Sequence, residues 1–434
     1  MTYPIAPAPR TWSPGDLITS PRLRADPGNL AWLLTRRPLF MGAQLTTGQS
    51  VSAVTPVSLD SEYEDNWSGH TEPSPYYQAP LSGWYLAEGQ ISLPLASAAS
   101  VIAAGIRYGS TGHTDLLCST QTSNTVNAPG PAACDLVSLN TATSDVVALT
   151  AYTNSGAGPV IAQPGAWFKA EWAALNSGGT VISSPQPAAA WPPGAGTTIT
   201  NSGGIAAGAT SMTVAAATGI VVGATLGLDY FEGAAVQPYA EKVTVTSVAG
   251  TTIGISATAY AHLQTAPVAV PVSAAWMNQQ VRDVIRFLAY PPFARLSAST
   301  SAQTLPTQTF PAGTAISFTS ATADNFGGWS SGTPTVWTVP VSGVYFVYGQ
   351  VPLSSTAAWN NLSAGVSVSG GTITWGDSLR SQTAQVGCAT FRGHLRLTAG
   401  QTLALYGSQS SAAAQPVVDG SDWYPTLVAL WRGF

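Results

Sequence analysis

Short apolar runs recur along the whole chain and are separated by clusters of Gly, Pro, Ser and Asn. Examples are residues 84–87, 344–348 and 402–406. These runs have no helical period, and apolar or alternating runs of this length between turn residues are typical of β-strands. The pattern therefore predicts a mainly β protein.

One stretch, within residues 269–293, has the period of a helix instead. Ser273 is placed to cap it, and Pro291 and Pro292 end it. Its apolar positions are Met277, Val281, Val284, Ile285 and Leu288. We expect an amphipathic helix whose apolar stripe packs against a neighbouring copy of the chain or against the end of a β-domain.

The chain contains an internal duplication. The segment APLSGWYLAEGQISL, which begins at Ala79, returns 260 residues later as VPVSGVYFVYGQVPL. The triplet 65–67 (DNW) likewise matches 324–326 (DNF), and 38–40 (PLF) matches 291–293 (PPF) at a spacing of 253. We expect two copies of one antiparallel two-sheet sandwich, over 41–176 and 294–434. The segment from Cys118 to Cys134 has no evident counterpart in the second copy.

The repeated Pro-x-Ser-Gly-x-Tyr strand, at residues 80–91 and 340–351, resembles the signature strand of the complement globular-head and tumour necrosis factor jelly rolls. The apolar C-terminal segment 425–434 is similar to the last strand of that family. The resemblance implies two jelly-roll sandwiches and a compact homotrimer. The predicted fold class is thus mainly β, with two duplicated antiparallel jelly-roll sandwiches, a small central β-domain and one or two short helices.

The remaining segments complete the predicted domain organisation. Residues 1–40 are expected to form an anchoring arm with a short helix, and 177–196 a Pro-rich linker. Residues 197–268 are expected to form a small β-domain, which resembles a unit common in virion proteins of tailed phages. The helix within 269–293 is similar to one that recurs in minor tail and other virion proteins of phages infecting actinobacteria.

Composition excludes several classes of protein. Only 8% of the 434 residues are charged and the net charge is −5, so the basic surface that nucleic-acid binding needs is missing. With 45% hydrophobic residues and 14 Trp, the chain has enough apolar surface to pack. It has no apolar run long enough for a membrane span, and its first residues lack the features of a signal peptide.

Catalytic motifs are scarce in the sequence. The four His residues are separated from one another and from Cys, which gives no zinc spacing. The Gly-x-Ser-x-Gly match at 328–332 lies among turn residues, so we expect a turn. We therefore predict no enzymatic activity and no cofactor. Cys118 and Cys134 either form a disulfide or remain buried thiols.

Two sets of residues are candidate ligand sites. The acidic residues are calcium candidates, although a solvated loop is the interpretation we favour: Asp60, Glu62, Glu64 and Asp65. The loop tryptophans are candidate stacking platforms for glycans, although packing in a core or an interface is again favoured: Trp67, Trp329 and Trp375.

These features together predict a non-enzymatic structural protein on the surface of a phage virion. We expect a trimeric minor tail protein or tail fibre, whose N-terminal arm binds other virion proteins and whose second jelly roll contacts the host surface. A capsid decoration or head-fibre protein is the nearest alternative. A glycan-binding receptor-recognition module and a glycan depolymerase are alternatives of other classes.

Overall fold

The computed structural model describes residues 37–45, 49–51, 53–91, 102–109, 114–121, 132–153, 160–161, 166–175, 197–217, 220–229, 241–269, 282–298, 303–353, 359–379, 387–417 and 424–433. Of these, residues 37–175 and 285–433 belong to one compact unit, and residues 197–284 to another. Residues 1–36 of the predicted arm and the whole of the predicted linker, 177–196, lie outside the described residues, whereas the last two residues of the predicted arm, Leu39 and Phe40, belong to a strand of the first jelly roll.

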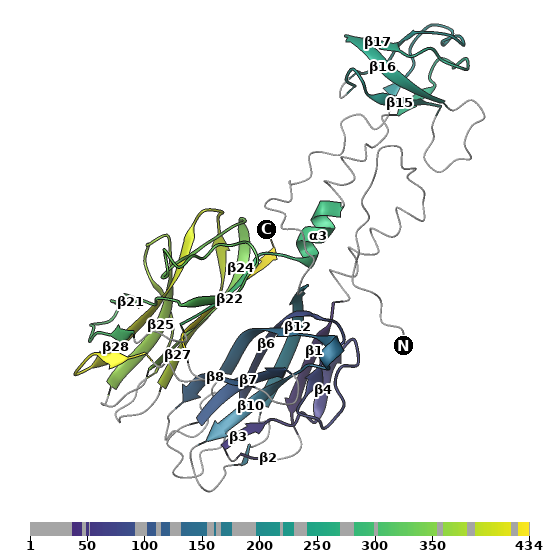
Figure 1. The fold of residues 1–434 in the computed structure, drawn as a ribbon. Helices are drawn as coiled ribbons and strands as arrows, with labels where there is room; N and C mark the ends of the chain where they lie inside the picture. The colour runs from purple at the N-terminus through teal and green to yellow at the C-terminus, as the bar shows by residue number, and fades with distance from the viewer. Residues whose placement is uncertain are drawn as a thin grey trace. The chain divides into compact units, whose positions relative to one another are not determined.

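The first jelly roll, called jelly roll 1 below, contains two antiparallel sheets (Figure 1). The first sheet has the order β4 (Ser61–Asp65), β1 (Leu39–Gln44), β12 (Ala166–Ala174), β6 (Gly83–Ile91), β9 (Ala132–Leu139). The second has the order β8 (Thr114–Gln121), β7 (Ile102–Gly109), β10 (Val146–Thr153), β3 (Ala53–Pro56), with β5 (Tyr77–Gln78) beside β10. A short pair, β2 (Gln49–Ser50) and β11 (Val160–Ile161), and the 3-10 turn η1 (Thr141–Thr143) complete it.

The second jelly roll, jelly roll 2, repeats this order (Figure 1). Its first sheet is β22 (Ser320–Asp324), β19 (Phe293–Ser297), β30 (Thr426–Gly433), β24 (Gly343–Leu353), β27 (Gly387–Leu397). Its second sheet is β26 (Thr374–Leu379), β25 (Trp359–Val368), β28 (Thr402–Ser411), β21 (Thr314–Ala315), with β23 (Trp337–Thr338) beside β28. The short pair is β20 (Thr304–Leu305) and β29 (Gln415–Pro416). The predicted mainly β fold with duplicated sandwiches is confirmed.

Alternation along each strand forms the two cores. In β6, Tyr85, Ala87 and Gly89 face the interior of the sandwich, whereas Trp84 and Leu86 face its outer side. The same period of two applies to β24, whose Tyr345 and Val347 belong to the core of jelly roll 2. Burial of these apolar side chains supplies most of the free energy that offsets chain entropy.

Equivalent hydrogen bonds show that the two sandwiches are copies of one plan. The Tyr85 hydroxyl donates to the Leu81 carbonyl at 2.7 Å, and the Tyr345 hydroxyl donates to the Val341 carbonyl at 2.7 Å. Both tyrosines are fully buried. Burial raises the pKa of both hydroxyls, more than the hydrogen bond to the carbonyl lowers it, so each stays protonated as a donor.

The first strands of the two jelly rolls, β1 and β19, correspond with a spacing that differs by one residue from the predicted 253. The side chains of Asn66 and Asn325 bind the strands β1 and β19, through the backbone amides of Leu39 and Phe293 respectively. Leu39 is therefore the counterpart of Phe293, and the spacing at this point is 254 residues instead of 253. The sequence match was shifted by one because a Phe stands at two different positions of the repeated strand.

The expectation that the segment from Cys118 to Cys134 has no counterpart is also wrong. Strand β8 contains Cys118 and β9 contains Cys134, and these strands take the places of β26 and β27. The segment looked like an insertion because the two copies share few residue types there. The side chain of Cys118 lies outside the described residues, so its pairing stays a prediction, and Cys134 is buried.

The small β-domain forms the other unit. Its sheet has the order β13 (Thr197–Thr198), β18 (Pro267–Ala269), β15 (Thr225–Leu228), β16 (Glu241–Ala249), β17 (Thr252–Ile255), β14 (Ser211–Thr213). Gly250, with φ of 60°, provides the left-handed residue of the tight turn between β16 and β17. Its own core includes Met212, Leu226 and Ile253.

The predicted helix is shorter among the described residues than its sequence period suggests. Helix α3 spans Asp283–Ala289, and Met277 and Val281 lie outside the described residues. Ile285 is buried, Val284 is half-buried, and Leu288 packs against the core of jelly roll 2. Phe287 enters that core, with its ring 4.8 Å from that of Trp431. Of the two partners expected for the apolar stripe, a neighbouring copy or the end of a β-domain, Leu288 therefore has the second.

Candidate interaction interface

The two jelly rolls meet through a buried cluster of side chains from the outer sides of their first sheets. Jelly roll 1 contributes Leu86, Cys134, Leu136, Ala173 and Ala174 to this cluster. Jelly roll 2 contributes Phe293, Ala323, Phe346, Tyr348, Val428 and Leu430. The rings of Trp84 and Phe293 lie 5.3 Å apart at its margin. A single bridge between Thr120 of β8 and Cys388 of β27 joins sheets of the two jelly rolls.

A buried ion pair crosses this contact. Arg295 of β19 donates to Asp135 of β9 through two nitrogens, Nε to Oδ1 at 2.7 Å and Nη2 to Oδ2 at 2.9 Å. The side chains of the two residues are 3% and 2% exposed. Burial alone would lower the pKa of Arg295, but the Asp135 carboxylate raises it well above its ordinary range. Arg295 therefore stays charged and bonded to Asp135.

Two further hydrogen bonds complete the surroundings of the guanidinium. Arg295 donates to the Thr322 hydroxyl at 3.2 Å and to the Tyr424 hydroxyl at 3.3 Å. A buried charge pair is stable only when its remaining donors and acceptors are also bonded. The pair consequently fixes how β19 lies against the edge strand β9.

A second charged group surrounds Glu171 of β12. Arg432 of jelly roll 2 binds its carboxylate with two nitrogens, at 2.8 and 3.2 Å. Arg37 and Lys169, both of jelly roll 1, approach it at 2.8 and 3.0 Å. Burial alone would raise the pKa of Glu171, but the three cations outweigh it and lower the pKa to about 2. Glu171 is therefore ionised throughout the ordinary pH range.

A third pair joins Glu88 of β6 to Arg392 of β27. The three pairs use a large share of the few charges that the chain has. Five of its 15 Lys and Arg residues take part in this contact: Arg37, Lys169, Arg295, Arg392 and Arg432. These pairs make the contact between the two jelly rolls specific, since buried pairs penalise every misaligned arrangement.

The four calcium candidates do not converge. Asp60 accepts from the Leu45 amide at 2.6 Å, and Glu62 lies 2.5 Å from Nδ1 of His70. Asp65 accepts from the Gly69 and His70 amides, whereas Glu64 is exposed. Within the described part of the chain, no three His, Cys, Asp or Glu side chains are grouped to hold a metal.

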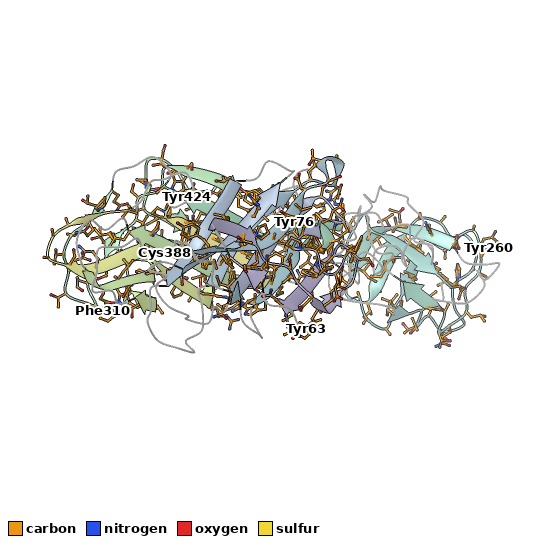
Figure 2. All side chains as sticks on the ribbon, turned by 90° about the horizontal axis from the view of Figure 1, so that it is seen from below. Tyr63, Tyr76, Tyr260, Phe310, Cys388 and Tyr424 are labelled. Atoms are coloured by element: carbon orange, nitrogen blue, oxygen red, sulfur yellow. The ribbon has the colours of Figure 1, made fainter. Side chains whose placement is uncertain are left out.

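The tryptophan candidates differ in accessibility. Trp67 is only 7% exposed, so its ring has little open face to offer a sugar in this structure. Trp329 is half-buried, and its indole donates to the Pro334 carbonyl at 3.3 Å. Trp375 is half-buried, and its ring lies 5.3 Å from that of Phe310, a residue that is 50% exposed. Figure 2 labels Phe310. A glycan role for Trp329 and Trp375 stays a prediction.

The Gly-x-Ser-x-Gly match lies in a turn, as predicted. The hydroxyl of Ser330 is 3.0 Å from that of Thr333, another turn residue.

The small β-domain holds a charged group that sequence reasoning missed. Nδ1 of buried His262 lies 2.6 Å from Asp229, and Nε2 lies 2.7 Å from Glu241. This group joins three loops and strands far apart in sequence.

Sequence reasoning also missed the Arg295–Asp135 pair. The two residues are separated by 160 positions, and neither belongs to a recognisable motif. A signal was nevertheless present, because each is a lone charge inside an apolar strand, FARLS and AACDLVSL. Such a charge is rarely buried without a partner.

No helix among the described segments has the length and apolar character of a membrane span.

The strand orders of the two sandwiches define the class of fold, a pair of jelly rolls. Among solved structures, the chain is similar to the globular domain of zebrafish complement 1qA protein, at 13% identity over 32% of this chain and 100% of that chain, with a TM-score of 0.25. It is also similar to murine APRIL, at 12% identity over 32% of this chain and 98% of that chain, with a TM-score of 0.24. No family model and no curated protein matches the sequence.

Proposed function

We propose that this chain is a non-enzymatic structural component of a tailed-phage particle, of the minor tail or fibre type, that acts by self-association. The observation that carries the proposal is the contact between the two jelly rolls. Within one chain, its buried Arg295–Asp135 pair and its apolar cluster join two jelly rolls in the way that permanent interfaces join separate subunits. The resemblances of the small β-domain and the helix to phage proteins give the proposed setting.

The test is whether the chain is part of the particle. Particles from a lysate of the producing strain are banded in a density gradient, and the bands are probed with an antibody against the chain. We expect the chain to band with the particles at constant stoichiometry, and gold-labelled antibody to decorate the tail. Label on the head would instead support the decoration alternative. A chain that stays at the top of the gradient would refute a structural role.

The self-association part has a separate measurement. Sedimentation equilibrium of the purified chain is expected to give a mass of three chains, as proposed for a trimer. A mass of one chain at every micromolar concentration would exclude self-association as the mode of action.

A glycan-binding function is a second candidate, and the Phe310–Trp375 pair favours it. An exposed ring next to a half-buried indole is a surface on which a sugar ring can stack. The full chain would then bind purified host cell-wall glycan saturably, and Phe310→Ala would weaken that binding about tenfold or more. Leu263→Ala, which changes a side chain 79% exposed in the small β-domain, is the matched control.

A further inference from the structure

Jelly roll 2 contains buried polar atoms that have no hydrogen-bond partner within the part of the chain that the structure describes. Two lie on β25, the side-chain oxygen of Asn361 and the hydroxyl of Ser363, and a third is the indole N–H of Trp375 on β26. Ser363 is fully buried. Proteins rarely leave a buried donor or acceptor unpaired, so each of these atoms needs a physical explanation.

These side chains lie on the outer side of the second sheet. Leu362 and Ala364 of β25 enter the core of jelly roll 2, so Ser363 and Gly365 face the opposite side of the strand. Gly365 is the ladder partner of Trp375. A Cβ atom on Gly365 would lie 2.7 Å from the indole ring, so the ring lies over this glycine, two positions from Ser363.

A turn at residues 309–313 lies against the same indole ring. A Cβ atom on Gly313 would be 2.7 Å from the Trp375 ring, and the Phe310 ring lies 5.3 Å from it. A fourth unpaired atom, Oε1 of Gln308, belongs to the residue that leads into this turn, and its backbone amide donates to Gln409 of β28, the neighbour of β25. Phe310 itself is 50% exposed. Unpaired polar atoms and an open aromatic ring thus occur together.

Jelly roll 1 shows how the same plan is built without this group. In each copy a leucine of the second sheet, Leu149 of β10 or Leu405 of β28, lies against the equivalent glycine of the repeated strand, β6 or β24. The two leucines are therefore counterparts. From them, the ladder register makes Gly105 of β7 the counterpart of Gly365 of β25.

The two copies differ at the positions beside this glycine. Ser363 corresponds to Ala103, and Trp375, the ladder partner of the glycine, corresponds to Leu117. Ala103 is fully buried, so the fold accepts an apolar residue where jelly roll 2 buries a hydroxyl. A buried polar group that the fold does not need, and that costs free energy while unpaired, indicates a ligand that supplies the missing partner.

The four unpaired atoms define the chemistry of that ligand. The Ser363 hydroxyl donates and accepts, the Trp375 N–H only donates, and the amide oxygens of Gln308 and Asn361 only accept. None of these residues is charged, so a charged ligand would be buried here without a counter-charge. A molecule with several hydroxyls matches the set, because each hydroxyl both donates and accepts. The apolar face of a sugar ring also stacks on an aromatic ring such as Phe310.

From this match we infer that jelly roll 2 binds an uncharged sugar at this place, with hydroxyls bonded to Ser363 and Trp375 and with the apolar face of the ring on Phe310. The inference rests on the glycan-binding candidate and adds the class of ligand and the residues that hold it. The unpaired atoms are closed off from solvent. The turn 309–313 therefore has to move aside from the indole ring when the ligand enters.

Two substitutions in jelly roll 2 test the inference. Ser363→Ala installs the residue that jelly roll 1 has at this position, and Trp375→Phe removes the N–H but keeps a ring. Each should weaken binding of the neutral polysaccharide fraction of the host cell wall to the full chain about tenfold or more, by isothermal titration calorimetry. Ala103→Ser, which places a hydroxyl at the equivalent position of jelly roll 1, is the matched control and should leave binding unchanged. Preferential binding of the acidic fraction would overturn the ligand class.

Stability separates a ligand site from a structural role. The Ser363 hydroxyl has no partner in the free chain, so Ser363→Ala should leave the midpoint of urea unfolding equal or higher. Lost binding at an unchanged midpoint supports the inference. A lower midpoint would mean that the hydroxyl serves folding, and it would overturn the inference. Variants that bind like the unmodified chain would mean that these groups meet ordered water only, with the same consequence.

Free sugars distinguish failure of the inference from failure of the glycan-binding function. Galactose, glucose, mannose and arabinose are each offered to the full chain in ligand-observed NMR. A chain that binds one of them through Ser363, but binds no cell-wall polysaccharide, would keep the site and refute that function. A chain whose binding of polysaccharide depends on Phe310 but not on Ser363 or Trp375 would keep that function and refute the site. A chain that binds none of these probes would overturn both.

Discussion

At the scale of single residues, the repeated tyrosine hydroxyl is a sensitive probe of the sandwich plan. Tyr345 is fully buried and donates to the Val341 carbonyl at 2.7 Å. Removal of the hydroxyl in Tyr345→Phe leaves that carbonyl without this donor, so we expect a loss of about 1 to 2 kcal/mol in the free energy of unfolding. Urea unfolding followed by far-UV circular dichroism measures it. Tyr63→Phe, at a side chain 59% exposed, should change stability little; equal effects would contradict the prediction.

A second residue-scale prediction concerns Gly343, at the start of β24. A Cβ atom there would lie 2.2 Å from Nε1 of Trp431 and 2.5 Å from the Gly433 carbonyl oxygen. Gly343→Ala should therefore force strand β30 to shift, at a cost of about 1 to 3 kcal/mol by urea unfolding. In Gly332→Ala the new atom meets nothing nearer than 3.9 Å. If that control destabilises the chain as much, the crowding argument fails.

At the scale of elements, the ion pair between β9 and β19 determines how the two jelly rolls pack. Arg295→Met leaves Asp135 buried without its partner, so we expect a loss of about 3 to 5 kcal/mol. Asp135→Ala should cost a similar amount. The double variant removes both charges and should regain much of the loss, because no unpaired group is then buried. Additive effects of the two single changes in a double-mutant cycle would show that the two side chains do not interact.

The contact between β12 and β30 should respond to acid through Glu171. Its pKa falls from the ordinary 4.5 to about 2 in the folded chain. A lowered carboxyl pKa adds stability at pH values above 4.5, and this stability is lost as the pH falls towards 2. The full difference corresponds to about 3 kcal/mol.

The measurement compares the unmodified chain with Glu171→Gln between pH 7 and pH 2. We expect the unmodified chain to lose its advantage in the free energy of unfolding between about pH 5 and pH 2. The two proteins differ only at position 171, where the carboxylate of Glu171 takes up a proton in this range and the amide of the variant does not. Parallel pH curves for the two proteins would refute the proposed role of the three cations around this carboxylate.

The strands and the duplication were predictable because they follow from local patterns. The repeated Pro-x-Ser-Gly-x-Tyr segment has both its turn and its buried tyrosine within a few positions, and alternation in β6 and β24 shows which side is buried. The contact between the jelly rolls was not predictable in this way. Asp135 and Arg295 are close only after both sandwiches have folded, and the sequence holds no local trace of that arrangement beyond a lone charge in each strand.

At the scale of the whole molecule, the chain has separate cores in its two units. The core of the small β-domain includes Met212 and Ile253, whereas that of jelly roll 2 includes Tyr345 and Trp337. Each core is stabilised by its own burial, so the two units are expected to unfold as separate cooperative transitions. Differential scanning calorimetry of the full chain should then show more than one transition.

His262 allows these transitions to be assigned. In His262→Ala the carboxylates of Asp229 and Glu241 lose the ring that lies between them, at 2.6 and 2.7 Å. That ring and the Ala259 amide, which donates to Glu241 at 2.7 Å, hold the loop that follows β17 against the sheet. The loss should destabilise the small β-domain by about 2 to 4 kcal/mol and lower its transition temperature. The transition of the jelly rolls should stay in place, since no described contact of His262 lies in that unit.

Arg295→Met is the reciprocal variant and should move only the jelly-roll transition. A joint shift of all transitions in either variant would mean that the chain unfolds as one cooperative body.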